Sequence, residues 1–213
     1  MDETSKGIVL RVRPLSDTSL IVHWITDTHG RLTTVAKGAK RPKSPHRGKL
    51  DLLFEADFTY QKSRRSDLHA LREVSLRNTH TKVSSDLNRL GILAYGTQLL
   101  EKATEPEYSM PGIYIIFSTL LKYLENHGPR RVLVYALEIK ILNELGIGPS
   151  IDDIDLHKDA ATLIEQLGYL NWETISELKP NRKQTLAIAE FLEIHIVQHL
   201  HSIPKGRAAA LSL

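Results

Sequence analysis

Residues 7–37 read GIVLRVRPLSDTSLIVHWITDTHGRLTTVAK, and this stretch decides the fold. Runs rich in β-branched and aromatic residues alternate in it with PLSDT and HG, which carry turn chemistry. Five short strands, separated by turn signals, are typical of a small barrel or sandwich. An OB-fold barrel is the five-stranded option that commonly binds oligonucleotides. The predicted strands cover residues 7–13, 19–26, 31–37, 52–60 and 68–76.

After residue 80 the apolar period changes to that of helices. Ser84 or Ser85 caps a helix that ends near Lys102, and further helices are predicted at 111–125, between Pro129 and Gly146, at 158–167 and at 182–201. The predicted fold class is therefore α+β and multidomain. An OB-fold nucleic-acid-binding domain covers residues 1–80, and an all-α helical domain covers residues 81–213.

The basic residues are concentrated in the first part of the chain. The net charge is +3, but residues 1–80 carry 15 Lys and Arg against 9 Asp and Glu, while residues 81–213 carry 13 against 16. The stretch from residue 31 to 49 has seven basic residues and no acidic one. The seven candidates for nucleic-acid binding are Arg31, Lys37, Lys40, Arg41, Lys43, Arg47 and Lys49.

The sequence KGAKRPKSPHRGK at 37–49 is broken by proline and glycine, so we predict a loop. A solvated loop that only adds solubility is the alternative. However, the two prolines and Gly48 restrict the path of the chain, and a restricted cationic loop loses less entropy when it binds a polyphosphate. Trp24, Phe54, Phe58 and Tyr60 fall on the inward faces of the predicted strands, so we expect charge to dominate over base stacking.

Other motifs give weaker signals. His195 and His199 stand at helical spacing near His201, but the glutamate of an HExxH zinc motif is missing, so we interpret them as a polar helix edge. The acidic residues at 152, 153 and 155 lack the glycine and glutamate of an EF-hand and are interpreted as solvated. A phosphodiesterase that uses these acids is the alternative, and metal-dependent turnover would support it. The chain has no GxxxxGK[ST], no GxGxxG and no cysteine. We expect no catalytic residue, no metal, no cofactor and no enzyme activity.

Residues 7–48, and above all VAKGAKRPKS with Arg47 and Gly48 downstream, resemble the N-terminus of the bacterial recombination mediator family RecO. The similarity continues through YALEIKILNELGIGPSID at 135–152 and returns in FLEIHIVQHLHSIPKGRAAAL near the end. The resemblance implies an OB-fold, a helical domain, binding of single- and double-stranded DNA, and annealing of complementary strands. It also implies partnership with RecR to load RecA onto DNA coated by single-strand binding protein.

One departure from the family concerns zinc. Many members carry a four-cysteine zinc module after the ELG segment, and this chain has no cysteine, so we expect no zinc site. The absence of cysteine also fits a reducing cytoplasm. The N-terminus MDETSKG is not that of a secretory signal, and no apolar run is long enough to span a bilayer. We expect a cytoplasmic, nucleoid-associated protein with no membrane partner.

The resemblance also implies contact with the acidic tail of single-strand binding protein. Arg130 and Arg131 begin a helix with an apolar stripe, and Lys140 lies further along it, so these three residues are the candidate peptide site. A surface-exposed pair at the end of a bundle is the alternative. A different function also fits the residues, namely an RNA-binding OB-fold module that acts in RNA handling or translation.

Overall fold

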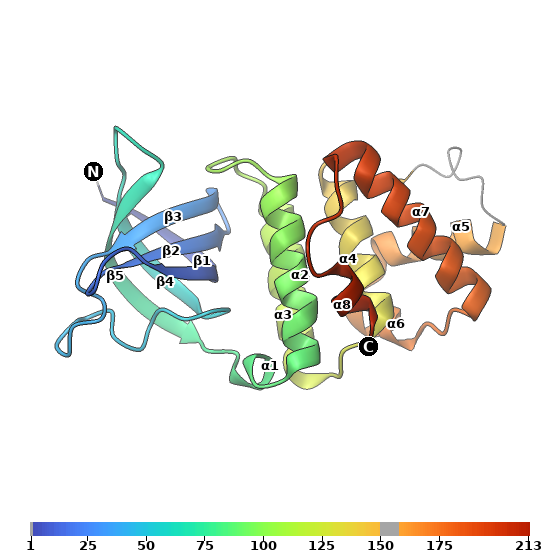
Figure 1. Cartoon of the computed structure of the whole chain (residues 1–213), viewed down its shortest axis with the longest axis horizontal. Helices are drawn as coiled ribbons and strands as arrows, with labels where there is room; N and C mark the ends of the chain where they lie inside the picture. Colours follow the sequence, from blue (N-terminus) through green and yellow to red (C-terminus); the bar gives the residue numbers. More distant parts are fainter. Residues whose placement is uncertain (1, 150–157) are drawn as a thin grey trace. The chain divides into compact units, whose positions relative to one another are not determined.

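The computed structural model describes residues 2–149 and 158–213 (Figure 1). The chain forms two compact units. The barrel unit consists of the residues up to Ser85 together with Thr104–Ser118, and the helical unit consists of Asp86–Ala103 together with the described part of Thr119–Leu213. The boundary expected between residues 80 and 81 stays a prediction, and the grouping adds a returning segment, Thr104–Ser118, to the barrel unit.

The barrel unit contains the five predicted strands, closed in the order β1-β2-β3-β5-β4. Neighbouring strands are antiparallel except β3 and β5, which run parallel through three residue pairs, Thr33–Leu68 to Val35–Ala70. This is the strand order of an OB-fold and confirms the predicted fold class. The strands are β1 (Asp2–Pro14), β2 (Leu20–Thr26), β3 (Gly30–Ala36), β4 (Glu55–Gln61) and β5 (Leu68–Asn78).

The barrel interior is filled by the alternating apolar residues of the strands. Trp24 and Phe58 stack inside with ring centroids 4.3 Å apart. The indole Nε1 of Trp24 donates to Thr34 Oγ1 at 2.9 Å, so this buried donor is satisfied. The residues of the core are Val9, Val22, Trp24, Leu32, Ala36, Ala39, Ala56, Phe58, Tyr60, Leu71 and Val74.

The fourth strand begins later than predicted. The alternating pattern was expected from Leu52, but β4 starts at Glu55, and Leu53 takes a positive φ of 66° with its side chain buried. The late start has a local cause. The Leu53 amide donates to Val9 O and the Val9 amide donates to Phe54 O, and these two bonds lie outside the regular β1–β4 pairing. β1 is also longer than predicted, because Asp2–Lys6 pair with β4.

The long helices of the second half were predicted, but the cap of the first was wrong. Asp86 Oδ1, and neither Ser84 nor Ser85, accepts bonds from the amides of Asn88 and Arg89, at 2.9 and 3.0 Å, and the helix begins at Leu87. Three short helices were not predicted. α1, α6 and α8 contain at most six residues, which is too short to show a helical period. The helices are α1 (Thr81–Ser84), α2 (Leu87–Ala103), α3 (Pro111–Asn126), α4 (Arg131–Glu144), α5 (Lys158–Tyr169), α6 (Trp172–Glu177), α7 (Arg182–Leu200) and α8 (Arg207–Leu211). Across the two described ranges, no helix is both long and apolar enough to span a membrane.

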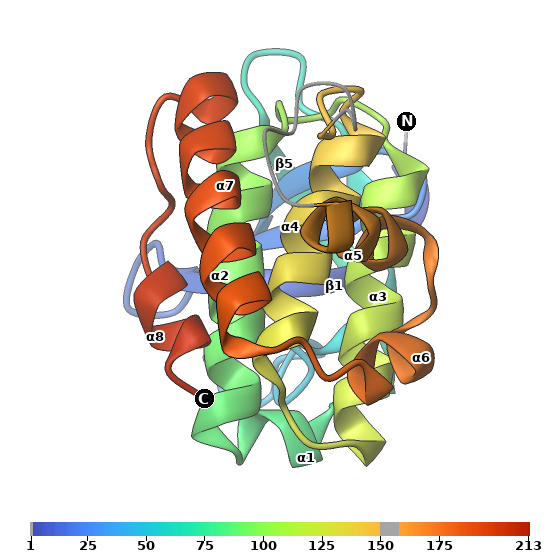
Figure 2. The same cartoon turned by 90° about the vertical axis from the view of Figure 1, so that its right-hand side faces the viewer.

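The helical unit is arranged around α4, which contacts α2, α5, α6, α7 and α8 (Figure 2). Its Glu138 is fully buried and receives two bonds from the Arg207 guanidinium, at 2.7 and 3.2 Å. The Tyr95 hydroxyl donates to the same carboxylate at 2.5 Å. Burial raises the pKa of Glu138, although the bonds from Arg207 oppose the shift. This network fixes the short helix α8 to α4 and α2.

Candidate nucleic-acid interface

The basic loop, residues 37–49, connects β3 towards β4 and is folded into successive turns. The amides of Arg41, Ser44 and Arg47 donate to the carbonyls three residues before them, at 3.0 to 3.2 Å. Two further bonds tie the loop to the β1–β2 connection, from the Lys40 amide to Thr18 O at 2.9 Å and from the Gly38 amide to Ser19 Oγ at 3.2 Å. The loop is therefore pre-ordered by its own backbone turns and by the β1–β2 connection.

Five cations of the basic loop extend into solvent. In residues 2–149 and 158–213, four of them form no ion pair or side-chain hydrogen bond, and the fifth, Arg47, donates one bond to Pro42 O at 3.2 Å. Because no carboxylate neutralises them, these charges are available to an anionic ligand. The five are Lys37, Lys40, Arg41, Lys43 and Arg47.

The other two predicted cations are held by the protein itself. Arg31 Nε donates to Thr104 Oγ1 at 2.9 Å, and its guanidinium also bonds Thr104 O. Lys49 Nζ donates to Val74 O at 3.0 Å and is half-buried. Both residues stay predicted DNA contacts, although the Arg31 guanidinium already bonds Thr104 and the Lys49 ammonium already bonds β5. Sequence alone gave no signal of this, because the partners lie 73 and 25 residues away.

A buried histidine lies inside the basic loop. His46 is 6% exposed, and its pKa is lowered by burial and by the neighbouring Lys49. The buried ring is therefore neutral at pH 7. Its protonation would place a further positive charge in a buried position, so the fold of the loop is linked to pH.

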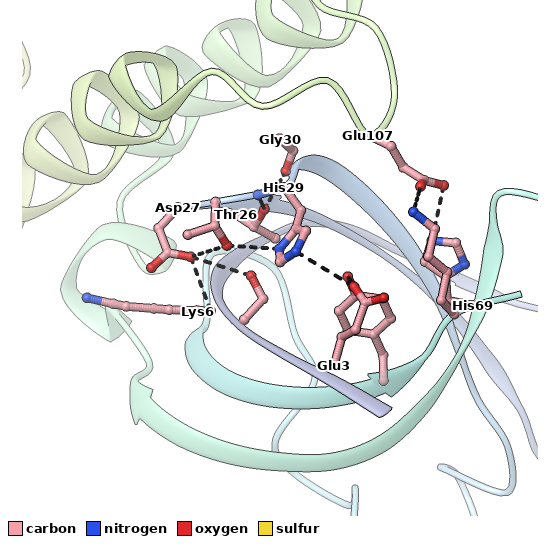
Figure 3. A network of polar contacts seen from close by, with 12 residues as sticks. Glu3, Lys6, Thr26, Asp27, His29, Gly30, His69 and Glu107 are labelled. Carbon is pink, nitrogen blue, oxygen red and sulfur yellow. Dashed lines mark hydrogen bonds and ion pairs between the residues drawn. The ribbon is translucent and has the colours of Figure 1, made fainter. Parts of the chain in front are cut away.

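The returning segment is held to the barrel by a polar network (Figure 3). Lys62 Nζ lies 2.7 Å from Glu107 Oε2, and His69 Nε2 lies 3.1 Å from Glu107 Oε1. The Ser63 amide donates to His69 Nδ1 at 3.3 Å, which leaves the His69 proton on Nε2, facing Glu107. The hydrogen bond from Lys62 lowers the pKa of Glu107 and, in turn, Glu107 raises the pKa of Lys62. The charge of Lys62 is thus largely balanced.

The sequence analysis missed a second group of cations, in the β4–β5 loop (residues 62–67, KSRRSD). Arg64 and Arg65 are exposed, and neither side chain binds another described residue. The stretch was interpreted only as a chain break between strands. The pair of adjacent arginines was the available signal, but only the closure of the barrel brings this loop next to β3.

The predicted aromatic core is confirmed for three of its four residues, and the fourth, Phe54, is only partly buried and packs against the core from outside β4. Trp24, Phe58 and Tyr60 are at most 2% exposed, so none of them offers a face to a base. The Tyr60 hydroxyl donates to Glu3 Oε2 at 2.7 Å. These strand aromatics stabilise the barrel, which leaves charge as the main property of its surface.

The three candidates in the helical unit all bind backbone carbonyls. Arg130 bonds Ser176 O, and Arg131 donates to Leu211 O at 2.7 Å. Lys140 Nζ donates to Gly168 O at 3.0 Å and Leu170 O at 2.8 Å, and burial lowers its pKa. Arg130 and Arg131 line a pocket of about 380 Å³, which Lys140 does not reach. The other residues of this pocket are Val132, Tyr135, Leu178, Lys179, Pro180, Thr185 and Leu213.

The histidines of α7 do not gather into a metal site. His195 Nε2 lies 2.7 Å from Ile147 O, and its ring packs against Phe191 and His199. Within the described ranges no three His, Cys, Asp or Glu side chains are placed to hold a metal ion. Asp152, Asp153 and Asp155 lie outside the described residues.

Comparison with known proteins assigns both parts of the chain. Residues 1–80 match the family described as "Recombination protein O N terminal", and residues 84–154 match "Recombination protein O C terminal". "DNA repair protein RecO" of Bacillus pumilus is 28% identical over 148 residues, which are 70% of this chain and 57% of the relative.

Two further relatives carry the same name. The one from Exiguobacterium sibiricum is 25% identical over 71% of this chain and 60% of its own length. The one from Halalkalibacterium halodurans is 28% identical over 71% of this chain and 59% of its own length. The matched region therefore spans less than two thirds of these relatives. The chain belongs to the RecO family of DNA repair proteins.

Proposed function

We propose that this chain binds single- and double-stranded DNA through its basic loop and anneals complementary strands. The observation that carries this is the set of five exposed cations on a pre-ordered loop, with no carboxylate paired to them among the residues described. Contacts to phosphates position a strand without reading its bases, which suits a protein that must accept any sequence.

The proposed mechanism of annealing is charge neutralisation. Two complementary strands repel each other through their phosphates, and a cationic surface that neutralises part of that charge lets them meet. Base pairing then supplies the specificity. The protein acts by binding, and no nucleotide is hydrolysed in this account.

We also propose that the chain works as a mediator with RecR and helps to load RecA onto DNA coated by single-strand binding protein, in association with the nucleoid. The family membership supports this, together with the pocket at Arg130 and Arg131. Lys179 adds a third cation to that pocket, and Val132 and Leu178 add apolar surface, which suits an acidic peptide. Lys140 is better explained as a structural residue, because two carbonyls already accept bonds from its Nζ.

The test is strand annealing by a charge-reversed loop. We expect K40E/R41E/K43E to lose binding to single-stranded DNA and annealing of DNA coated by single-strand binding protein. The control K122E/R182E/K205E makes the same change in net charge at exposed positions of the helical unit and should anneal normally. A loop variant that anneals like the wild type would refute the assignment. Competition with RNA of matched sequence separates DNA handling from the RNA-binding alternative.

A further inference from the structure

A hollow lies on the barrel surface along the seam where β3 and β5 run parallel. Its volume is about 290 Å³, just below the range of roughly 300–1,000 Å³ for small-molecule sites. This size suits one unit of a longer chain better than a whole cofactor. The lining residues are Val35, Lys37, Gln61, Lys62, Ser63, Leu68, His69 and Ala70.

The lining combines two chemistries. Val35, Leu68 and Ala70 supply apolar surface, while Lys37 and Lys62 supply ammonium groups. Apolar surface suits a sugar or a base, and an ammonium group suits a phosphate. Lys62 is paired with Glu107, so Lys37 contributes the larger part of the available charge in the hollow.

The seam joins the two cationic loops of the barrel. Lys37 begins the basic loop, and Lys62 begins the β4–β5 loop that carries Arg64 and Arg65. Figure 1 shows these loops at opposite ends of the barrel. The β4–β5 loop is ordered by its serines, since Ser63 Oγ accepts from the Arg65 amide at 3.3 Å and Ser66 Oγ accepts from the Leu68 amide at 3.4 Å.

We propose that a DNA strand runs from the basic loop along the β3–β5 seam to the β4–β5 loop, where Arg64 and Arg65 bind its phosphates. One nucleotide of the strand occupies the hollow. This inference rests on the proposed function and adds the path and two binding residues.

The dimensions of the seam agree with a short piece of strand. From residue 33 to residue 37, four steps along β3 cover about 13 Å. Phosphates of one DNA strand follow each other by about 3.4 Å along a B-form axis, so at most about four of them cover the seam. Asp67 is the carboxylate of the β4–β5 loop, and two arginines in the same loop outweigh it.

The first test is the salt dependence of binding. Each phosphate contact to a single strand contributes about 0.7 to the slope of log affinity against log salt, so R64Q/R65Q should make that slope shallower by about 1.4. The thermal midpoint should stay that of the wild type, because neither side chain binds another described residue. The control R182Q/K205Q removes two exposed cations from the helical unit and should leave the slope unchanged.

The second test places a probe in the β4–β5 loop. The chain has no cysteine, so S66C provides a unique site for a fluorophore, and S84C provides a control on exposed α1. An oligothymidylate should change the fluorescence at position 66 and not at 84. An equal response at 66 to thymidine monophosphate alone would overturn the strand path and make the hollow a small-anion site.

The two assignments fail in different ways. If R64Q/R65Q keeps the wild-type slope while K40Q/R41Q/K43Q loses part of it, the strand path is wrong and the DNA-binding function stands. If neither variant changes the slope, the proposed function falls together with the path.

Discussion

The lysines and arginines of the basic loop differ from three that tie the helical unit together. In the basic loop, the side chains of Lys40, Arg41 and Lys43 extend into solvent and form no ion pair or hydrogen bond with a described residue. In the helical unit, Arg131 and Lys140 donate to backbone carbonyls, and Arg207 is paired with a buried carboxylate. The comparison separates cations that are available to an anionic ligand from cations that are used inside the fold. A count of basic residues does not make that distinction.

Among the cations compared here, the largest loss of unfolding free energy is expected when Arg207 is replaced. Replacing it with methionine leaves Glu138 buried without its partner, which costs about 3–5 kcal/mol of unfolding free energy. Urea unfolding measures the loss. The control E193Q removes a carboxylate whose side chain is 62% exposed, and its cost should stay below about 1 kcal/mol. Wild-type stability in R207M would show that charge in this unit is not structural.

A smaller loss is expected at Lys140. K140M removes the ammonium group that donates to the carbonyls of Gly168 and Leu170, and the expected cost is about 1–3 kcal/mol. The exposed K122M should cost nothing measurable by the same urea titration. If K140M instead kept its stability and lost affinity for the acidic tail peptide, Lys140 would belong to the peptide site after all.

The smallest effect concerns pH and the basic loop. His46 has a lowered pKa in the folded state, while the unfolded chain takes the ordinary value of about 6.5. Between the two values the unfolded state binds more protons, so stability is full above about pH 6.5 and falls on acidification through that window. The thermal midpoint measured from pH 7.5 to 5.5 should therefore drop less in H46Q than in the wild type. The exposed H201Q is the matched control, and equal drops in H46Q and the wild type would contradict the assignment.

Much of the fold was predictable from the sequence because it rests on local patterns. The first three strands and the long helices leave periodic patterns of apolar residues in the sequence. The turns between the strands are marked by their residue types. The exposure of Lys40 and its neighbours followed from the proline-broken loop. The hydrogen bonds from Arg31 to Thr104 and from Arg131 to Leu211 O were not predictable. Only tertiary packing brings together these partners, which lie 73 and 80 residues apart in the sequence.

The central claim is that the exposed cations of the basic loop hold a DNA strand by charge. The direct measurement is the affinity for an oligothymidylate, by fluorescence anisotropy, between 50 and 200 mM salt. Five loop cations contribute about −3.5 to the log–log slope, which weakens binding roughly 100-fold over this range. K40Q/R41Q/K43Q should have a slope shallower by about 2.1 at unchanged thermal stability. An unchanged slope in this variant would contradict the account.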